Sequence, residues 1–320
     1  MKTILYANTI SYFSPLQQRP HHIMNLLAKR GYKIHWVETK QSLKRRENYG
    51  NITVWHDWEI FKKRIKEVDI YFSTWANRYV DLDQINYKYC IYDSVDNFKQ
   101  HENNEIKMIN KADYVLVTSE LLYKIRKHQH KNVVNCKNGC FSDLGNKVYN
   151  KPRDVEQFKD GYLLFSGALG TWVDISVLEY IARKYPVVFV GSPYGARIPK
   201  NVFYLGSKKY DELQAYYSYC DLNLLPFKRC QTSDYSNPIK MYEGMSHGKI
   251  TVSTDIPDAL LYKDVVLCSN NKEHFLQNVK KGLSIKNNPE VIIKCKNNAK
   301  ENDWNIRVEK IEKIIRELGE

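Results

Sequence analysis

One stretch of the chain, residues 224–255, brings together cations, hydroxyls and a carboxylate that could bind a phosphate-bearing sugar. The six side chains are Lys228, Arg229, Thr232, Ser236, Lys240 and Glu243. Cations suit phosphate oxygens, and a carboxylate can bind a pair of sugar hydroxyls, as acidic residues bind ribose in nucleotide sites. The cluster therefore predicts a nucleotide-sugar site. Taken alone, Glu243 is more simply interpreted as a solvated helix residue.

A strand, a loop and a helix are expected to position these side chains. Residues 222–225 are apolar and predict a strand, and residues 250–254 predict the next one. Between them, Pro238 suits a first helical turn, where its missing N–H is not needed, and Gly248 suits the helix end. A helix N-terminus after a strand presents free N–H groups and a positive dipole to phosphate. Many α/β units contain such a strand, loop and helix. The prediction of a nucleotide-sugar site therefore depends on the polar cluster that this unit carries.

A second group of polar residues begins an expected helix over residues 20–30. Arg19, His21 and His22 lie at its N-terminus, after an expected strand at residues 3–7. A metal site is not expected, because adjacent side chains diverge and the spacing suggests no third ligand. The functional interpretation makes His21 a catalytic candidate, and Arg19 and His22 acceptor contacts. The alternative is a pair of partly exposed histidines at a helix start.

Two carboxylates follow another expected strand, at residues 89–92. Asp93 falls at the strand end and Asp96 three residues later. A carboxylate here could take the proton from an acceptor hydroxyl as general base, and Asp93 is the preferred candidate. Helix capping is the alternative for either residue. Paired carboxylates of a glycoside hydrolase fit less well beside the nucleotide-site features.

Strands alternate with helical segments along the whole chain, which predicts α/β architecture with doubly wound parallel sheets. The 320 residues suggest two domains, each large enough to bury a core. We place the first at residues 1–150 and the second at residues 151–302, with a last helix at residues 303–320. The second domain opens on a strand at residues 162–166 and a glycine loop. There Gly167 and Gly170 let the backbone approach a ligand, and Thr171 or Asp174 can cap the next helix.

Composition is that of a soluble globular protein, with 43% hydrophobic and 27% charged residues. No apolar run is long enough for a membrane span, and seven cysteines without a CxxC pair fit a reducing cytoplasm. The net charge is +13, mostly within residues 1–150. Basic clusters lie at residues 40–46, 62–66 and 124–131. They suit an anionic membrane surface or a lipid-diphosphate acceptor; solvated lysines are the alternative. No nucleic-acid-binding motif is visible.

The segment PFKRCQTSDYSNPIKMYEGMSHGKITVSTDIPD resembles the donor-site signature of bacterial GT-B glycosyltransferases, P-x-K-x-x-E-x-x-A-x-G-K-P-V-V. It is similar to teichuronic-acid and capsular-polysaccharide enzymes grouped with retaining family four. The resemblance implies a GT-B fold, with two Rossmann-like domains facing a central cleft and the last helix packed back on the first. It also implies that Glu243 binds the donor ribose. Further along the family pattern, YLGSKKYDELQAYYSYCDLNLLPF places Tyr210 near the base, where it could stack; a surface tyrosine is the alternative.

The chain departs from the family at two places. The usual earlier Glu is Tyr235 here, with Asp234 beside it. The glycine loop also lacks the family's Arg and Lys for the diphosphate. We therefore expect Lys228, Arg229 and Lys240 to take their place.

The resemblance implies transfer of a sugar from a nucleoside-diphosphate donor, with a UDP-sugar favoured. The acceptor would be a saccharide or a polyprenyl-diphosphate-linked intermediate of cell-envelope polysaccharide, made in the cytoplasm or at the inner face of the membrane. Retention is favoured over inversion. Cations and a helix N-terminus can stabilise the departing diphosphate, so neither a metal nor a cofactor is expected. A GT-B epimerase, a non-catalytic partner subunit and a nucleic-acid-binding protein are the alternatives.

Overall fold

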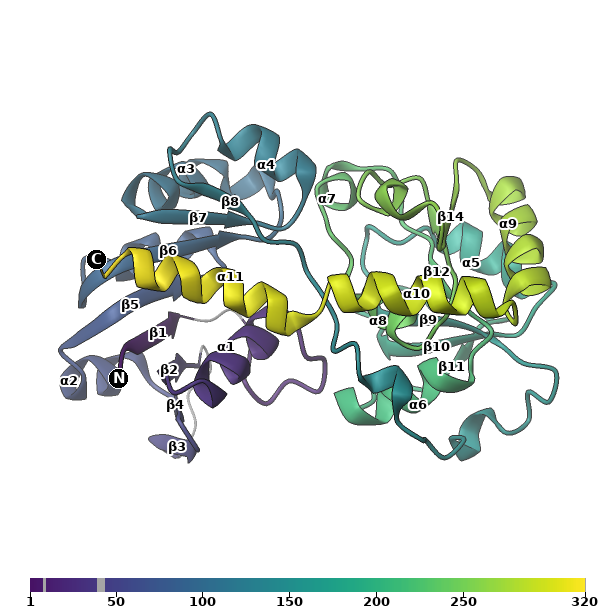
Figure 1. The fold of residues 1–320 in the computed structure, drawn as a ribbon, viewed down its shortest axis with the longest axis horizontal. Coiled ribbons are helices and arrows are strands. Elements are labelled where there is room, and N and C mark those ends of the chain that lie inside the picture. Colours follow the sequence, from purple (N-terminus) through teal and green to yellow (C-terminus); the bar gives the residue numbers. More distant parts are fainter. Residues whose placement is uncertain (8–9, 39–43, 320) are drawn as a thin grey trace. The chain divides into compact units, whose positions relative to one another are not determined.

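The computed structural model describes residues 1–7, 10–38 and 44–319 (Figure 1). Contacts divide the chain into two compact units. The first unit contains Met1–Lys137 and Asn305–Glu320, and the second contains Asn138–Trp304. The first segment of the first unit therefore ends at Lys137, before the boundary at residue 150 that was predicted from the sequence. Each unit is built on its own sheet.

In the first unit, the described strands form an eight-stranded sheet in the order β3-β4-β2-β1-β5-β6-β7-β8. The pairs are parallel except that between β3 and β4. The strands are β1 (Thr3–Ala7), β2 (Lys33–Val37), β3 (Arg46–Tyr49), β4 (Ile52–Trp55), β5 (Glu67–Ser73), β6 (Asn86–Ser94), β7 (Tyr114–Val117) and β8 (Val133–Asn135). The helices are α1 (Arg19–Lys29), α2 (Trp58–Arg64), α3 (Glu102–Lys111), α4 (Glu120–Arg126) and α11 (Trp304–Glu317), with 3₁₀ turns at Ala76–Asp81 and Lys99–His101.

Continuous apolar runs explain why the inner strands of this sheet are buried on both faces. β1 pairs with β2 on one side and with β5 on the other, and Ile4 to Ala7 are all buried. Strands covered on both faces by helices read as such runs rather than as alternating patterns. The hairpin strand β3 was not predicted. Its four residues are intermediate or exposed, so they lack the hydrophobic pattern that would reveal them.

In the second unit, six described strands form a sheet in the order β11-β10-β9-β12-β13-β14, and the pairs are parallel. The strands are β9 (Leu163–Ala168), β10 (Val187–Ser192), β11 (Phe203–Tyr204), β12 (Leu222–Leu225), β13 (Thr251–Thr254) and β14 (Val266–Ser269). The helices are α5 (Ile175–Ala182), α6 (Tyr210–Tyr219), α7 (Gln231–Asp234), α8 (Ile239–Ser246), α9 (Lys272–Ile285) and α10 (Pro289–Glu301). Further 3₁₀ turns lie at Leu144–Asn146, Arg153–Val155 and Ala259–Tyr262.

Local sequence signals set the ends of the central helix of this unit. Pro238 has extended backbone before α8, and Gly248, just beyond its end, has φ +70°. Positive φ is free of steric cost only in glycine, which ends a helix well. Met241, Tyr242 and Met245 of α8 pack into a buried cluster with Leu225 at the end of β12. The expected strand, loop and helix around the polar cluster are therefore confirmed.

None of the described helices is both long and apolar enough to cross a bilayer. The basic cluster at residues 40–46 lies partly outside the described residues, because residues 39–43 are not described.

Candidate functional site

The strand order of the second unit indicates where a ligand binds. Strand β9 pairs with β10 on one side and with β12 on the other, so the connections leave the sheet in opposite directions between β9 and β12. In open α/β sheets, ligands bind outside the carboxyl ends of the strands at such a switch point. The glycine loop follows β9, and the loop leading to α8 follows β12. The polar cluster of the sequence therefore lies at the expected edge.

Glu243 is buried in α8, with 1% of its side chain exposed. Its Oε2 accepts hydrogen bonds from Lys240 Nζ at 2.8 Å and from the Tyr217 hydroxyl at 3.2 Å. Its Oε1 is also buried, and no donor among the described residues contacts it. The interpretation of Glu243 as a solvated helix residue is therefore wrong. Leaving a buried carboxylate oxygen without a hydrogen bond costs free energy. The hydroxyl of a bound ligand could donate the missing hydrogen bond to Oε1.

Lys240 links the first turn of α8 to the end of β9. Its side chain is 14% exposed and forms the ion pair with Glu243. Gly167 adopts φ +120°, and a Cβ placed there would lie 3.7 Å from Lys240 Cε. Gly167 thus combines a backbone conformation that favours glycine with close contact to the lysine stem. The structure brings these three predicted residues together.

Two further residues, which were not predicted from the sequence, join this group. The Tyr217 hydroxyl, which contacts Glu243, also lies 2.6 Å from the Ser166 hydroxyl. Both side chains are buried, Tyr217 in α6 and Ser166 in β9. Tyr217 lies within the second family segment quoted above, and Ser166 does not. Nothing local in the sequence distinguishes either residue from a core residue.

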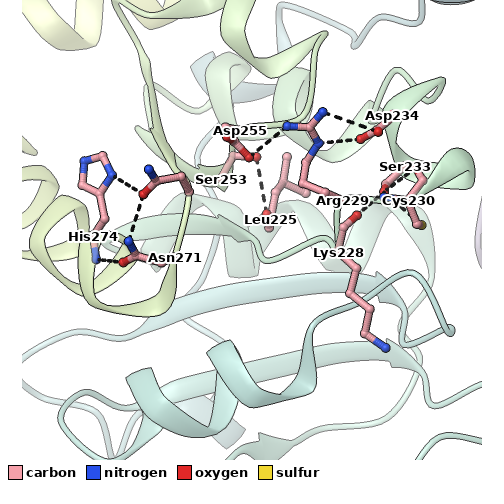
Figure 2. Close-up of polar contacts among 11 residues, drawn as sticks. Leu225, Lys228, Arg229, Cys230, Ser233, Asp234, Ser253, Asp255, Asn271 and His274 are labelled. Carbon is pink, nitrogen blue, oxygen red and sulfur yellow. Dashed lines mark hydrogen bonds and ion pairs between the residues drawn. The ribbon is translucent and has the colours of Figure 1, made fainter.

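Arg229 is engaged by two carboxylates (Figure 2). Its Nε lies 2.6 Å from Asp234 Oδ1, and its Nη1 lies 3.3 Å from Asp255 Oδ1. These two anions more than offset the single charge of the guanidinium. In this structure Arg229 ties the short helix α7 to the end of β13, and a diphosphate would have to displace carboxylates to reach it.

Other residues of the same loop differ in their accessibility. Lys228 is exposed, and its side chain extends away from Arg229 (Figure 2). Its carbonyl oxygen accepts a hydrogen bond from Ser233. Thr232 lies in α7 and is half-buried, and the Ser236 hydroxyl donates to the Ser233 carbonyl at 2.9 Å. Of the two cations in this loop, Lys228 is therefore the more accessible.

The remaining donor-side predictions fall at and beyond the glycine loop. A Cβ on Gly170 would overlap the ring of Trp172, so this position requires glycine for packing. Thr171 is exposed, whereas Asp174 caps α5 by accepting from Ser176 N at 3.0 Å. Tyr210 is buried, with 8% exposed. Tyr210 is therefore not a surface tyrosine. Its ring is covered by the surrounding chain and has no open face on which a base could stack.

In the first unit, Arg19 and Asp93 form a buried, bidentate ion pair. Arg19 Nε donates to Asp93 Oδ2 at 2.6 Å and Nη2 donates to Oδ1 at 3.0 Å. Burial alone would lower the pKa of Arg19, but the charge of Asp93 raises it above its ordinary value. Both oxygens of Asp93 are thus held by Arg19, and Asp93 is fully buried. This geometry argues against Asp93 as the general base and against Arg19 as a free acceptor contact.

His21 and His22 are both buried, each 1% exposed, so the alternative of two partly exposed histidines is wrong. The His21 ring accepts at Nδ1 from Gln18 N at 3.0 Å, and its Nε2 donates to the Ser11 carbonyl at 3.0 Å. Burial lowers the pKa of His21. Both ring nitrogens therefore form hydrogen bonds with the loop before α1. His21 could exchange a proton with a substrate only if one of these hydrogen bonds broke.

Asp96 is the carboxylate of the first unit whose protonation is most clearly perturbed toward neutral pH. Desolvation, followed by the charges of Glu105 and Asp93, raises the pKa of Asp96 to about 6. Glu105 itself is fixed, since it pairs with Arg126 at 3.0 Å and accepts from Ser94 Oγ at 2.6 Å. A carboxylate with a pKa near 6 is a suitable proton acceptor at neutral pH.

Within the part of the chain that the structure describes, no three His, Cys, Asp or Glu side chains are grouped closely enough to hold a metal ion. Metal-independent chemistry stays a prediction.

No family model matches the sequence. A curated relative, "Putative teichuronic acid biosynthesis glycosyltransferase TuaH" of Bacillus subtilis (strain 168), is 24% identical over 171 residues. That match spans 48% of this chain and 43% of the relative, less than half of each.

Solved structures match the chain over nearly its whole length. Sucrose-phosphate synthase from Thermosynechococcus elongatus has a TM-score of 0.79 at 12% identity and covers 99% of both chains. Alr3699/HepE from Anabaena, in complex with UDP, has a TM-score of 0.69 at 12% identity, with 99% of this chain and 100% of that chain covered. α,α-Trehalose 6-phosphate synthase from Burkholderia multivorans has a TM-score of 0.72 at 11% identity, covering 99% and 98%. At these identities the likeness shows the fold, which is GT-B.

Proposed function

We propose that this chain, which has the GT-B fold, transfers a sugar from a nucleoside-diphosphate donor to a saccharide or lipid-linked acceptor in cell-envelope polysaccharide synthesis. One observation carries the proposal: Glu243 is buried at the switch point of the second sheet with Oε1 unpaired. Such an oxygen can accept from a ribose hydroxyl. A UDP-sugar is the favoured donor, in keeping with the similar structure of Alr3699/HepE in complex with UDP-glucose. The envelope context rests on the TuaH match.

The donor diphosphate would be bound by Lys240 and Lys228 together with the N-terminus of α8. That helix has no acidic residue in its first turn, so its positive dipole end is not offset there. Negative charge grows on the diphosphate as the sugar departs, and fixed cations stabilise it most in the transition state. Lys240 lies 2.8 Å from Glu243 Oε2, so the cation that would bind the diphosphate lies beside the carboxylate that would bind the ribose.

The acceptor would be bound by the first unit, with Asp96 as the general base. Its raised pKa, about 6, leaves it mostly ionised at pH 7 yet basic enough to take a hydroxyl proton. Asp96 replaces Asp93 in this role because Arg19 holds both oxygens of Asp93. Retention remains favoured over inversion through the family resemblance alone.

Nucleotide binding is the direct test. We expect UDP or a UDP-sugar to raise the melting temperature of the protein, since a ligand that binds only the folded state stabilises it. Glu243→Gln should abolish the shift. Glu273→Gln is the matched control, because Glu273 is 59% exposed on α9 of the same unit.

The alternatives predict different results. A GT-B epimerase would convert the sugar of the donor without acceptor. A non-catalytic subunit would bind no donor, and a nucleic-acid-binding protein would bind oligonucleotides in a salt-sensitive way that nucleotide-sugars do not compete. Wild-type protein that binds none of the UDP, ADP and GDP sugars would overturn the proposed function.

A further inference from the structure

We infer that Tyr217 and Ser166 are positioning residues, which orient the Glu243 carboxylate so that Oε1 is the oxygen presented to the donor ribose. This inference rests on the proposed function. It concerns three elements that meet at one point: Ser166 comes from β9, Tyr217 from α6 and Glu243 from α8. Hydrogen bonds of 2.6 Å and 3.2 Å connect them in that order.

Donor and acceptor chemistry fixes the direction of these hydrogen bonds. An ionised carboxylate can only accept, so the Tyr217 hydroxyl must donate its hydrogen to Glu243 Oε2. That hydrogen is then used, and in the 2.6 Å contact the Tyr217 oxygen must accept from the Ser166 hydroxyl. The three groups therefore form a chain of hydrogen bonds, in which Ser166 donates to Tyr217 and Tyr217 donates to the Glu243 carboxylate.

The ring of Tyr217 is held in place by its surroundings. It is fully buried and lies parallel to the His247 ring, with 5.7 Å between centroids and 15° between planes. His247 is fixed in turn, because its Nε2 lies 2.9 Å from Gln214 Oε1. The Gln214 amide donates to the Tyr210 carbonyl at 3.0 Å, so Oε1 is its acceptor atom and His247 Nε2 carries the hydrogen.

The two oxygens of Glu243 have different contacts. Lys240 and Tyr217 both contact Oε2, while Oε1 has no donor among the described residues. If Lys240 turns to the diphosphate when donor binds, Tyr217 still holds Oε2. The carboxylate then keeps its orientation, and Oε1 stays directed to the ribose hydroxyls. A group fixed before binding loses less conformational freedom when the ligand arrives.

The test compares UDP with 2′,3′-dideoxy-UDP, which lacks both ribose hydroxyls, by calorimetric titration of the whole protein. We expect wild-type protein to prefer UDP. In Tyr217→Phe that preference should fall about tenfold, the size expected for losing a hydrogen bond to a charged group. The affinity for 2′,3′-dideoxy-UDP should hardly change, because the contact acts through the ribose. Ser166→Ala should lower the preference by a smaller factor.

Tyr216→Phe is the matched control. Tyr216 precedes Tyr217 in the same helix, is also buried, and donates its hydroxyl to a different carboxylate, that of Asp154, at 2.8 Å. Its removal should leave the preference for UDP unchanged. A melting curve of each variant reports on folding, and if Tyr217→Phe does not fold, Ser166→Ala decides the test.

The outcomes separate the two proposals. Equal losses of affinity for UDP and 2′,3′-dideoxy-UDP in Tyr217→Phe, or an unchanged preference in Ser166→Ala, would overturn the positioning role while leaving the donor site intact. Wild-type protein that binds UDP and 2′,3′-dideoxy-UDP equally would overturn the ribose contact itself. Wild-type protein that binds no nucleotide would overturn the proposed function.

Discussion

At the residue scale, the two carboxylates near the end of β6 have opposite environments although only three positions separate them. Asp93 is paired with Arg19 through both oxygens. For Asp96, desolvation and the negative charges of Glu105 and Asp93 raise the pKa to about 6. One carboxylate is therefore committed to an ion pair, and the pKa of the other lies closer to neutral pH. Different environments often separate the roles of neighbouring carboxylates.

We predict that Asp96→Asn leaves nucleotide affinity unchanged and lowers sugar transfer roughly 10²- to 10⁴-fold, the usual contribution of a general base. In wild-type protein, kcat/KM should rise with pH through about 6 and then level off, because only the ionised carboxylate accepts a proton. Transfer assays with a fixed donor between pH 5 and pH 8 would measure both effects. Full activity of Asp96→Asn at pH 7 would exclude this role.

Asp93→Asn is predicted to act on stability instead. Arg19 is 3% exposed, and this substitution removes the negative charge that pairs with its buried guanidinium. Breaking such a pair costs about 3–5 kcal/mol. Urea unfolding would show a lower free energy of unfolding for Asp93→Asn than for Asp96→Asn. Comparable stabilities would contradict the structural role of the ion pair.

His247 is predicted to make the protein less stable in mild acid. Burial, helped by the charges of Lys249 and Lys296, lowers its pKa to about 3 from an ordinary value of 6.5. Below pH 6.5 His247 binds a proton in the unfolded chain, whereas in the folded chain it stays neutral until the pH approaches about 3. The free energy of unfolding therefore falls with decreasing pH, by up to about 1.4 kcal/mol per pH unit.

His247→Gln keeps a donor toward Gln214 but cannot titrate. We expect the difference in urea midpoint between pH 7.5 and pH 5 to shrink in this variant. His128→Gln, at an exposed position, is the control and should behave as wild type. A pH dependence that is the same in all three proteins would refute the assignment to His247.

At the scale of elements, the approach of β10 to β9 depends on glycine. Gly191 has φ +153°, and a Cβ there would overlap the carbonyl oxygen of Gly167, which is backbone and cannot move aside. Gly167 is its register partner at the edge where the ligand is expected. The two glycines therefore keep the strands together just before the loops of the proposed donor site.

We predict that Gly191→Ala lowers the free energy of unfolding by at least about 2 kcal/mol more than Gly195→Ala does. Gly195 also has positive φ, +80°, but a Cβ there would meet no atom within 4 Å. The control therefore carries the cost of backbone strain alone, and the difference measures the overlap. Denaturant unfolding of the two variants would test this, and equal losses would show that β10 can shift to accommodate a methyl group.

At the scale of the whole molecule, the net charge of +13 favours an anionic partner. Lys62, Lys63 and Lys66 line a surface hollow of about 370 Å³ in the first unit, which Asp83 also lines. Lys62 is paired with Glu59 at 2.7 Å, whereas Lys63 and Lys66 are exposed. The last two are therefore the lysines that a charged membrane surface could reach.

We predict binding to vesicles that contain an anionic lipid, weakened in Lys63→Gln/Lys66→Gln and lost at high salt because surface charges are screened. Lys280→Gln/Lys281→Gln removes the same charge from exposed positions on α9 and serves as the control. Vesicle sedimentation would measure all three proteins. Equal binding by the two double variants would mean that only the net charge matters. Oligonucleotides that displace the vesicles would favour the nucleic-acid alternative.

Local signals in the sequence determined the elements around the proposed donor site. Apolar runs gave β9 and β12, Pro238 and Gly248 marked the ends of α8, and these signals act within a few residues. Glu243 and Lys240 could be selected because they belong to a cluster of cations, hydroxyls and a carboxylate within residues 224–255. The exposed strand β3 carries no such pattern and could not be predicted.

Only the tertiary structure decided how the selected side chains are used, because their partners are distant in sequence. Ser166 and Tyr217 are 51 positions apart, and Tyr217 and Glu243 are 26 apart. Arg19 and Asp93 are 74 apart. Propensity and periodicity describe neighbours along the chain, whereas burial, ion pairing and the pKa of Asp96 depend on neighbours in space. The sequence therefore predicted which side chains could do the chemistry, and folding decided which of their atoms remain available for it.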